Sequence, residues 1–243
     1  MAFKQQPKHI LTCAVLALLD TSTLNAGTIV PPPILKKDQQ SQAIITTVSS
    51  VCDGLAHYPD LGPDDLVVCD LDETLVKHEK LSEEWLKKPF HEQITEWRFS
   101  LIDDRLPTVF KLLHEKNIPV VALTHTRTGS FESIPSMERW RFDIVNSLGL
   151  KFSFDEKKHT FQLTKMPKPY PSFFKGIILT AHQPKGHVLQ AFLKKTKMTP
   201  KRILFFDDLK SNIDHVHKTL AGTTHLHCFH ITNEAIATMP KDI

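Results

Sequence analysis

The sequence predicts an α/β fold built on a parallel sheet. Three apolar runs, at 66–69, 118–123 and 202–206, are too short for typical helices and contain many β-branched or aromatic residues, so each predicts a buried strand. Polar residues follow each run, and helical patterns lie between the runs. Strands that alternate with helices are joined by right-handed crossovers, which would place the carboxyl ends of all three strands at one edge.

The composition is that of an ordinary globular protein. With 243 residues, the chain is long enough for one large domain or for a core with a small cap. The net charge of +3, with His neutral, gives no reason to expect a nucleic-acid partner. The four cysteines show no CxxC spacing, so they indicate neither a redox motif nor a zinc site. The oligomeric state has no signature in the sequence.

The first 26 residues have the order of a secretory signal peptide. Lys4 and Lys8 precede the apolar run 10–19, and the small Ala26 offers a cleavage position. The run is too short to span a bilayer as a helix, so no membrane span is expected. We therefore expect a periplasmic or secreted protein. The alternative is an ordinary amphipathic helix at the start of a cytoplasmic protein.

Residues 27–65 are expected to form a linker and an N-terminal helix. Three consecutive prolines at 31–33 favour an extended linker. Apolar residues at helical spacing, including Ile44, Val48 and Leu55, predict a helix over 41–55. The core would then occupy residues 66–243.

Two insertions are expected within the core. Residues 77–104 carry one apolar stripe at helical spacing, including Trp85, Ile94 and Trp97, and predict a small helical lid. Residues 151–180 alternate instead and predict a β-hairpin insertion with short strands at 151–154, 160–164 and 173–180. The apolar patterns of the remaining core predict helices over 107–116, 134–148 and 186–197 and a final strand over 224–231.

Acidic residues follow two of the predicted central strands. Asp70 and Asp72 come after the first, and Asp207 and Asp208 come after the third, so up to four carboxylates would meet at one edge. Such a cluster requires a cation, and donors that are all oxygen point to Mg²⁺. A site of this kind suits a phosphate monoester.

Two further side chains would complete a phosphate site. Lys185 can supply positive charge, and Thr124 at the end of the second strand can donate a hydrogen bond to a phosphoryl oxygen. Since no Ser/His/Asp or Cys/His set accompanies the acidic residues, the attacking group would be a carboxylate, which can form an acyl phosphate. A second carboxylate can protonate the leaving oxygen and later deprotonate water.

These residues resemble the motifs of the haloacid-dehalogenase-like (HAD) superfamily. DLDET, residues 70–74, is similar to its first motif, Thr124 after IPVVAL to its second, Lys185 in PKG to its third, and FFDDLKSN to its acidic fourth. The remainder is most similar to a small, poorly characterised bacterial branch of that superfamily. The resemblance covers residues 66–231 and implies a Rossmann-like parallel sheet with helices on both faces.

The resemblance also implies roles for individual residues. Asp70 would be the nucleophile and Asp72 the general acid and base. Mg²⁺ would be held by the Asp70 carboxylate, the Asp72 main-chain carbonyl and Asp207. Further roles would fall to supporting residues: Asp208 or Asn212 beside the metal, Thr74 in fixing the turn, and Arg127 as a phosphate or lid contact or as a surface charge. Which of the two adjacent aspartates binds the metal directly is left open.

The sequence thus predicts a Mg²⁺-dependent phosphatase that acts through an aspartyl-phosphate. Its substrate would be a phosphorylated small molecule or a phosphoprotein. The alternative is a catalytically silent HAD-like exported binding protein, against which the complete set of motif residues argues.

Overall fold

An eight-stranded sheet forms the centre of the molecule. The computed structural model describes residues 44–79, 83–153 and 160–232. The strands of the sheet are β1 (Ile44–Val48), β2 (Asp65–Cys69), β5 (Val120–Thr124), β6 (Thr160–Gln162), β7 (Ser172–Phe174), β8 (Ile177–Leu179), β9 (Arg202–Asp207) and β10 (His225–Ile231). Their order is β1-β10-β9-β2-β5-β8-β7-β6, parallel from β1 to β8 and antiparallel from there to β6. The predicted α/β fold with a mostly parallel sheet is confirmed.

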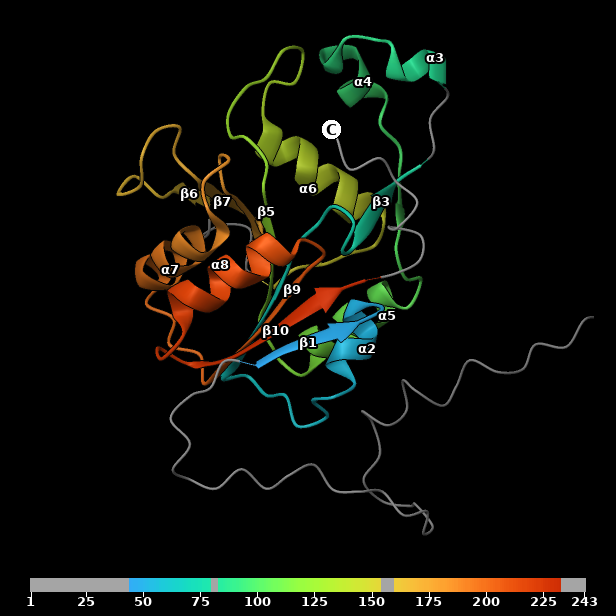
Figure 1. Ribbon diagram of the computed structural model, residues 1–243. Coiled ribbons are helices and arrows are strands. Elements are labelled where there is room, and N and C mark those ends of the chain that lie inside the picture. The colour runs from blue at the N-terminus through green and yellow to red at the C-terminus, as the bar shows by residue number, and fades with distance from the viewer. Residues whose placement is uncertain (1–43, 80–82, 154–159, 233–243) are drawn as a thin grey trace, which may run out of the picture.

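Helices cover both faces of the sheet (Figure 1). They are α2 (Val51–Leu55), α5 (Leu106–Glu115), α6 (Met137–Ser147), α7 (Lys185–Thr196) and α8 (Lys210–Leu220). Successive side chains of a strand point to opposite faces. In β2, Val67 and Cys69 therefore join the core under α2, α5 and α6, whereas Leu66 and Val68 join the core under α7 and α8. A strand buried on both faces needs the near-continuous apolar run that predicted it.

The chain reverses its direction of travel across the sheet beside β2. From β2 it proceeds to β5 and β8 on one side, and it then returns to place β9 and β10 on the other side. In open α/β sheets, the carboxyl ends of the strands at such a reversal are where ligands bind. This position lies between the ends of β2 and β9, where Asp70 and Asp207 are located.

The expected helix over 41–55 is wrong for most of its length. Residues 44–48 form β1, which pairs with β10 at the sheet edge, and only 51–55 are helical. The sequence of β1 is IITTV, five consecutive β-branched residues, which favour a strand over a helix. Ser50 then caps α2 by accepting a hydrogen bond from the Asp53 amide. Residues 41–43 lie outside the described part.

The segment expected to be a helical lid contains a β-ribbon as well as helices. β3 (Val76–His78) and β4 (Phe99–Leu101) pair antiparallel and enclose α3 (Glu83–Leu86) and α4 (Phe90–Glu96). The helical expectation is therefore wrong at both ends of 77–104. There, three-residue runs such as Phe99-Ser100-Leu101 alternate apolar and polar residues, which suits a strand.

The expected hairpin over 151–180 extends the main sheet. The single strand predicted at 173–180 is two strands, β7 and β8, and residues 151–153 are not in a strand. Lys175 and Gly176 both have positive φ, 47° and 88°, so they form the two-residue turn that joins β7 to β8. β8 is a parallel neighbour of β5, so this segment belongs in part to the core sheet.

Several expectations fall on residues outside the described part. They are the signal peptide over 1–26, the linker that precedes residue 41, residues 80–82 of the lid, residues 154–159 of the hairpin and residues 233–243 at the end of the expected core. Among the described residues, no helix combines the length and the apolar character needed to cross a membrane.

Candidate active site

The sheet itself fixes the first acidic residue of the site. β2 is buried at every position, and Asp70 is the first residue beyond it. The Asp70 amide donates a hydrogen bond to the Phe206 carbonyl of β9 at 2.9 Å, which extends the strand pairing by one residue. Asp70 is therefore held beside the end of β9, and only 6% of its surface is exposed.

A tight backbone turn follows and sets the position of Asp72. The amides of Leu75 and Val76 both donate to the Leu71 carbonyl, at 2.9 and 3.0 Å. Thr74 is buried, and within the described chain its hydroxyl has no hydrogen-bond partner. Backbone hydrogen bonds thus hold the turn, and the role expected for Thr74 stays a prediction.

Lys185, the first residue of α7, lies between two carboxylates at this edge. Its Nζ is 2.7 Å from Asp70 Oδ1 and 2.7 Å from Asp207 Oδ2, and the residue is 1% exposed. A buried ammonium or carboxylate is costly unless it is paired. The structure therefore brings three of the predicted residues into one buried ion-paired group.

Close helix packing carries Lys185 to this position. The Gly186 amide donates to His215 Nδ1 of α8 at 3.1 Å. A Cβ at Gly186 would lie 2.6 Å from Thr219 Oγ1 and 2.8 Å from the His215 carbonyl oxygen, closer than real Cβ contacts allow. Only glycine permits α7 to begin this near to α8. In the PKG sequence, Lys185 therefore supplies the charge and Gly186 allows the close packing.

Asp207 is the most fully engaged carboxylate of the site. Its Oδ1 accepts hydrogen bonds from the Leu209 amide at 3.0 Å and from Asn212 Nδ2 at 2.9 Å, while Oδ2 faces Lys185. Asn212 thus supports Asp207 from the first turn of α8. The adjacent Asp208 is only partly buried.

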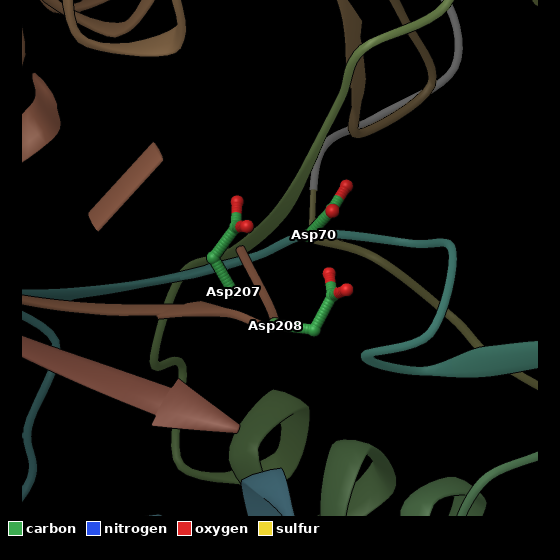
Figure 2. Close-up of side chains that lie close together, drawn as sticks. All are labelled: Asp70, Asp207 and Asp208. Carbon is green, nitrogen blue, oxygen red and sulfur yellow. The ribbon is translucent and has the colours of Figure 1, made fainter. Parts of the chain in front are cut away.

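Three carboxylates gather where β2 and β9 end. Oxygen atoms of Asp70, Asp207 and Asp208 lie within 4.8 Å of one another, and Figure 2 shows the three side chains. Lys185 supplies one positive charge against these three negative groups. Clustered carboxylate oxygens are the donors that hard divalent cations prefer. The cluster could therefore hold a metal ion.

The raised pKa values of carboxylates in and near this cluster also indicate an excess of negative charge. Burial raises the pKa of Asp70 well above its ordinary value, against the opposing charge of Lys185. Burial and the charge of Asp207 raise the pKa of Asp208 to about 6. Burial and the charge of Asp208 raise the pKa of Glu73, in the turn, to about 7. A bound cation would relieve this repulsion.

Asp72 lies on the far side of the turn, within a separate polar group. Its side chain is 32% exposed, and Thr124 Oγ1 of β5 is 3.5 Å from Asp72 Oδ2. Arg141 Nη2 donates to the same oxygen, and His78 Nε2 is 3.8 Å from Oδ1. The two predicted residues Asp72 and Thr124 thus lie together, in contact with an arginine and near a histidine that were not predicted.

The sequence does contain a signal for Arg141. Met137, Arg141 and Val145 are four residues apart on α6, and all three are buried. An arginine in register with the apolar stripe of a helix faces inward, and a buried arginine needs an anionic partner. Applied to the helix predicted at 134–148, this rule would have singled out Arg141.

Arg127 contacts an aromatic ring of its own loop. Its guanidinium carbon lies 3.9 Å from the centroid of the Phe131 ring, and its charge contributes to lowering the pKa of His182, where burial is the larger cause. Arg127 is half-buried on the loop after β5. The role of Arg127 therefore stays a prediction.

Comparison with known proteins finds a family match and several relatives. Residues 83–235 match a family described as "Protein of unknown function (DUF2608)", a range that contains Thr124, Arg141, Lys185 and Asp207. An uncharacterized protein of Rickettsia bellii is 26% identical over 113 residues, which cover 44% of this chain and 39% of the relative. An uncharacterized protein of Rickettsia prowazekii is 26% identical over 110 residues, which cover 43% and 37%. The chain thus matches well under half the length of these relatives.

A solved structure was also found. It is that of a haloacid dehalogenase-like family hydrolase from Streptococcus pneumoniae, with a TM-score of 0.32 and 10% identity, and the match covers 67% of this chain and 92% of that one. None of these comparisons supplies a reaction for this chain.

Proposed function

The chain belongs to the family described as "Protein of unknown function (DUF2608)", and we propose that it hydrolyses phosphate monoesters as a HAD-like, Mg²⁺-dependent phosphatase. One observation carries the proposal. Lys185 lies 2.7 Å from both Asp70 and Asp207, at the sheet edge where Asp208 completes an acidic cluster. A buried carboxylate next to a buried ammonium and a cation site is suited to attack an anionic phosphoryl group.

The four resembling sequence motifs support the same reaction. Residues of the first, third and fourth motifs meet in the acidic cluster, and Thr124 of the second lies beside Asp72. These residues come from the ends of β2, β5 and β9 and from the start of α7. A structural ion pair alone would not require four separate segments to present polar groups at one edge.

In the first step, the Asp70 carboxylate attacks phosphorus. A bond forms between an Asp70 carboxylate oxygen and phosphorus, and the bond from phosphorus to the ester oxygen breaks with its electron pair on the leaving oxygen. Asp72 in its acid form protonates that oxygen, so the alcohol departs and an aspartyl-phosphate remains.

In the second step, water releases the phosphate. The water oxygen bonds to phosphorus, the bond to Asp70 breaks, and its electron pair returns to the carboxylate. Asp72, now ionised, accepts the proton of the water. Thr124 Oγ1 is 3.5 Å from Asp72 Oδ2, and in this step it would donate a hydrogen bond to a phosphoryl oxygen.

The residues at the sheet edge fit a divalent cation. Asp70, Asp207 and Asp208 provide clustered oxygen donors, and the raised pKa values of Asp70 and Asp208 reflect burial that a cation would compensate. Mg²⁺ bound there would neutralise charge on the phosphoryl oxygens. Lys185 holds Asp70 and Asp207 in place beside that position.

Replacing the nucleophile tests the proposal. Asp70→Asn should lower the hydrolysis of para-nitrophenyl phosphate in the presence of Mg²⁺ by at least a hundredfold, on the order expected when a nucleophile is removed. The exposed Asp104→Asn is the matched control and should retain wild-type activity. Undiminished turnover by Asp70→Asn would exclude the mechanism.

The alternative function, a catalytically silent binding protein, predicts a different result. The wild-type protein would then hydrolyse none of a panel of small phosphate esters and phosphopeptides. Calorimetry would separate the cases further, because absence of Mg²⁺ binding would favour the silent protein. The same panel would show whether the substrate is a small molecule or a phosphoprotein.

A further inference from the structure

Arg141 is a buried arginine that the reaction described above does not use. It is 3% exposed, its Nη2 donates to Asp72 Oδ2, and its Nε is 3.3 Å from Thr126 Oγ1. Thr126 Oγ1 is 2.9 Å from Thr124 Oγ1, which in turn is 3.5 Å from Asp72 Oδ2. The four side chains therefore form a closed ring of polar contacts around one oxygen of Asp72.

Aromatic rings fix the guanidinium of Arg141 from another direction. Its central carbon lies 5.7 Å from the Phe99 ring centroid and 5.2 Å from that of Trp140. Phe99 belongs to β4, so the ribbon between the core and its insertion contributes to the placement of Arg141. Contacts with both polar and aromatic partners leave this side chain little rotational freedom.

The two oxygens of Asp72 have different surroundings as a result. Oδ2 is held by Arg141, whereas Oδ1 has no hydrogen-bond partner among the described residues, and His78 Nε2 lies 3.8 Å from it. Arg141 Nη1 is also buried without a partner in the described chain. Buried polar groups are normally satisfied, and exceptions call for an explanation. An arginine placed only for stability would be expected to use all its donors.

We propose that Arg141 is a positioning residue for Asp72, which it anchors through Oδ2 so that Oδ1 faces the leaving group. This inference rests on the proposed function, because it assigns to Arg141 a part in the same reaction. Transfer of a proton needs the acid within hydrogen-bond distance of the departing oxygen. An Asp72 side chain that rotates freely would satisfy this condition only part of the time.

The consequence depends on the leaving group. When the bond from phosphorus to an alkyl oxygen breaks, its electron pair produces a strongly basic alkoxide that needs the Asp72 proton. A para-nitrophenolate is stable enough to leave without that proton. Loss of Arg141 should therefore slow the hydrolysis of alkyl phosphates much more than the hydrolysis of the aryl phosphate. A general loss of structure would instead slow the hydrolysis of both esters to the same extent.

The experiment compares kcat/KM for ethyl phosphate and para-nitrophenyl phosphate, with Mg²⁺ present, in wild type and Arg141→Met. We expect a fall of about tenfold to a hundredfold for ethyl phosphate and a fall of less than about threefold for the aryl ester. Arg141→Lys should restore part of the loss, because it keeps the charge without the two-pronged geometry. In an Asp72→Asn background, Arg141→Met should cause no additional loss for ethyl phosphate.

A matched control is available on the same helix. Arg139 of α6 is largely exposed and pairs with Asp143 one turn along, so Arg139→Met should leave both kcat/KM values unchanged. A readout that needs no activity is the arginine Nε–H signal in nitrogen-15 NMR spectra. Asp72→Asn should shift the Arg141 signal and accelerate its exchange with water, while the Arg139 signal stays in place.

The outcomes separate the two proposals. The positioning role would be overturned, and the phosphatase proposal left intact, if wild type is active and Arg141→Met lowers kcat/KM equally for the two esters. An Arg141 Nε–H signal that is unchanged by Asp72→Asn would have the same consequence. A wild-type protein that hydrolyses neither ester would overturn the phosphatase proposal and the positioning role with it. A selective loss on ethyl phosphate, partly restored by lysine, supports both.

Discussion

Lys185 is the residue on which the acidic site depends for its charge balance. Its ammonium pairs with Asp70 and Asp207, and all three groups are buried. Burial lowers the pKa of Lys185, but the carboxylates of Asp207 and Asp70 outweigh that effect, and the net shift is upward. Lys185 therefore stays charged in the folded protein and supports both carboxylates.

Removing this charge should weaken the fold and create a dependence on metal. Lys185→Met leaves two buried carboxylates without their partner, which should lower the free energy of unfolding by about 3 kcal/mol. Added Mg²⁺ should restore part of that loss, because the ion supplies positive charge at the same carboxylates. Urea denaturation with and without Mg²⁺ measures both effects.

The exposed Lys194→Met on the same helix is the control, and its unfolding should match that of wild type. Equal stability of Lys185→Met and Lys194→Met without metal would contradict the role given to the buried ion pair.

Most of the acidic site could be predicted from the sequence, because its residues follow strands. Asp70 and Asp207 each come directly after an apolar run, and parallel topology then brings them together. Arg141 contributes from the middle of a helix, where only its register with the apolar stripe distinguishes it. His78 comes near Asp72 through a ribbon whose residues fit a helical pattern. Contacts between an insertion and the core are not encoded by local patterns.

The turn between β7 and β8 decides how the middle of the chain joins the sheet. Gly176 has a φ of 88°, and a Cβ at this position would lie 2.3 Å from Phe152 Cβ. Two constraints therefore act on one residue: a backbone conformation that L side chains rarely adopt and a contact with no room for a methyl group.

A pair of glycine substitutions can separate these constraints. Gly222→Ala meets the same unfavourable φ, here 83°, but no atom within 4 Å of the added Cβ. It should lower stability by about 1–2 kcal/mol. Gly176→Ala should cost about 1–3 kcal/mol more, because Phe152 must move. Thermal and urea unfolding of the two variants provide the measurement. Equal losses of unfolding free energy would show that Phe152 can move aside without destabilising the fold.

The elements whose ranges the sequence predicts best are strands buried on both faces and helices with a residue that marks their end, such as a proline in the first turn. β9 and α5 agree with their predicted ranges within one residue at each end. In β1, apolar residues at positions such as Ile44, Val48 and Val51 fit helical spacing and so predict a helix, while the β-branched run 44–48 favours a strand. In short segments the two periodicities overlap, and pairing with β10 decides the outcome.

Histidines make the stability of the molecule sensitive to acid. At the junction of β1 and β10, both ring nitrogens of His227 contact hydroxyl groups, those of Thr46 and Tyr58. Burial and the charge of neighbouring His57 lower the pKa of His227 to about 4, below its ordinary value of about 6.5. Between these two pH values the unfolded chain binds the proton more readily than the folded protein does.

The contribution of His227 to stability should therefore fall as the pH drops from 6.5 towards 4. For His227 we expect a loss of about 1 kcal/mol between pH 7 and pH 5, after allowance for partial exposure. The buried carboxylates with raised pKa values act in the opposite direction, so the test is the difference between variants. His227→Gln should lose less stability over this interval than wild type in urea denaturation.

The exposed His225→Gln on the same strand should behave as wild type does. An identical pH dependence in wild type and His227→Gln would contradict the assignment.

The strand order also determines when the site can exist. Asp70 is synthesised early, but β9, which places Asp207 beside it, comes near the end of the described chain. β1 likewise cannot pair until its partner β10 has been synthesised. Pairings between segments this distant in sequence form slowly, because a long loop must close first. A growing chain therefore lacks the acidic cluster. The carboxylates could hold a cation only once the sheet has closed, so metal binding at this cluster would report on the finished fold.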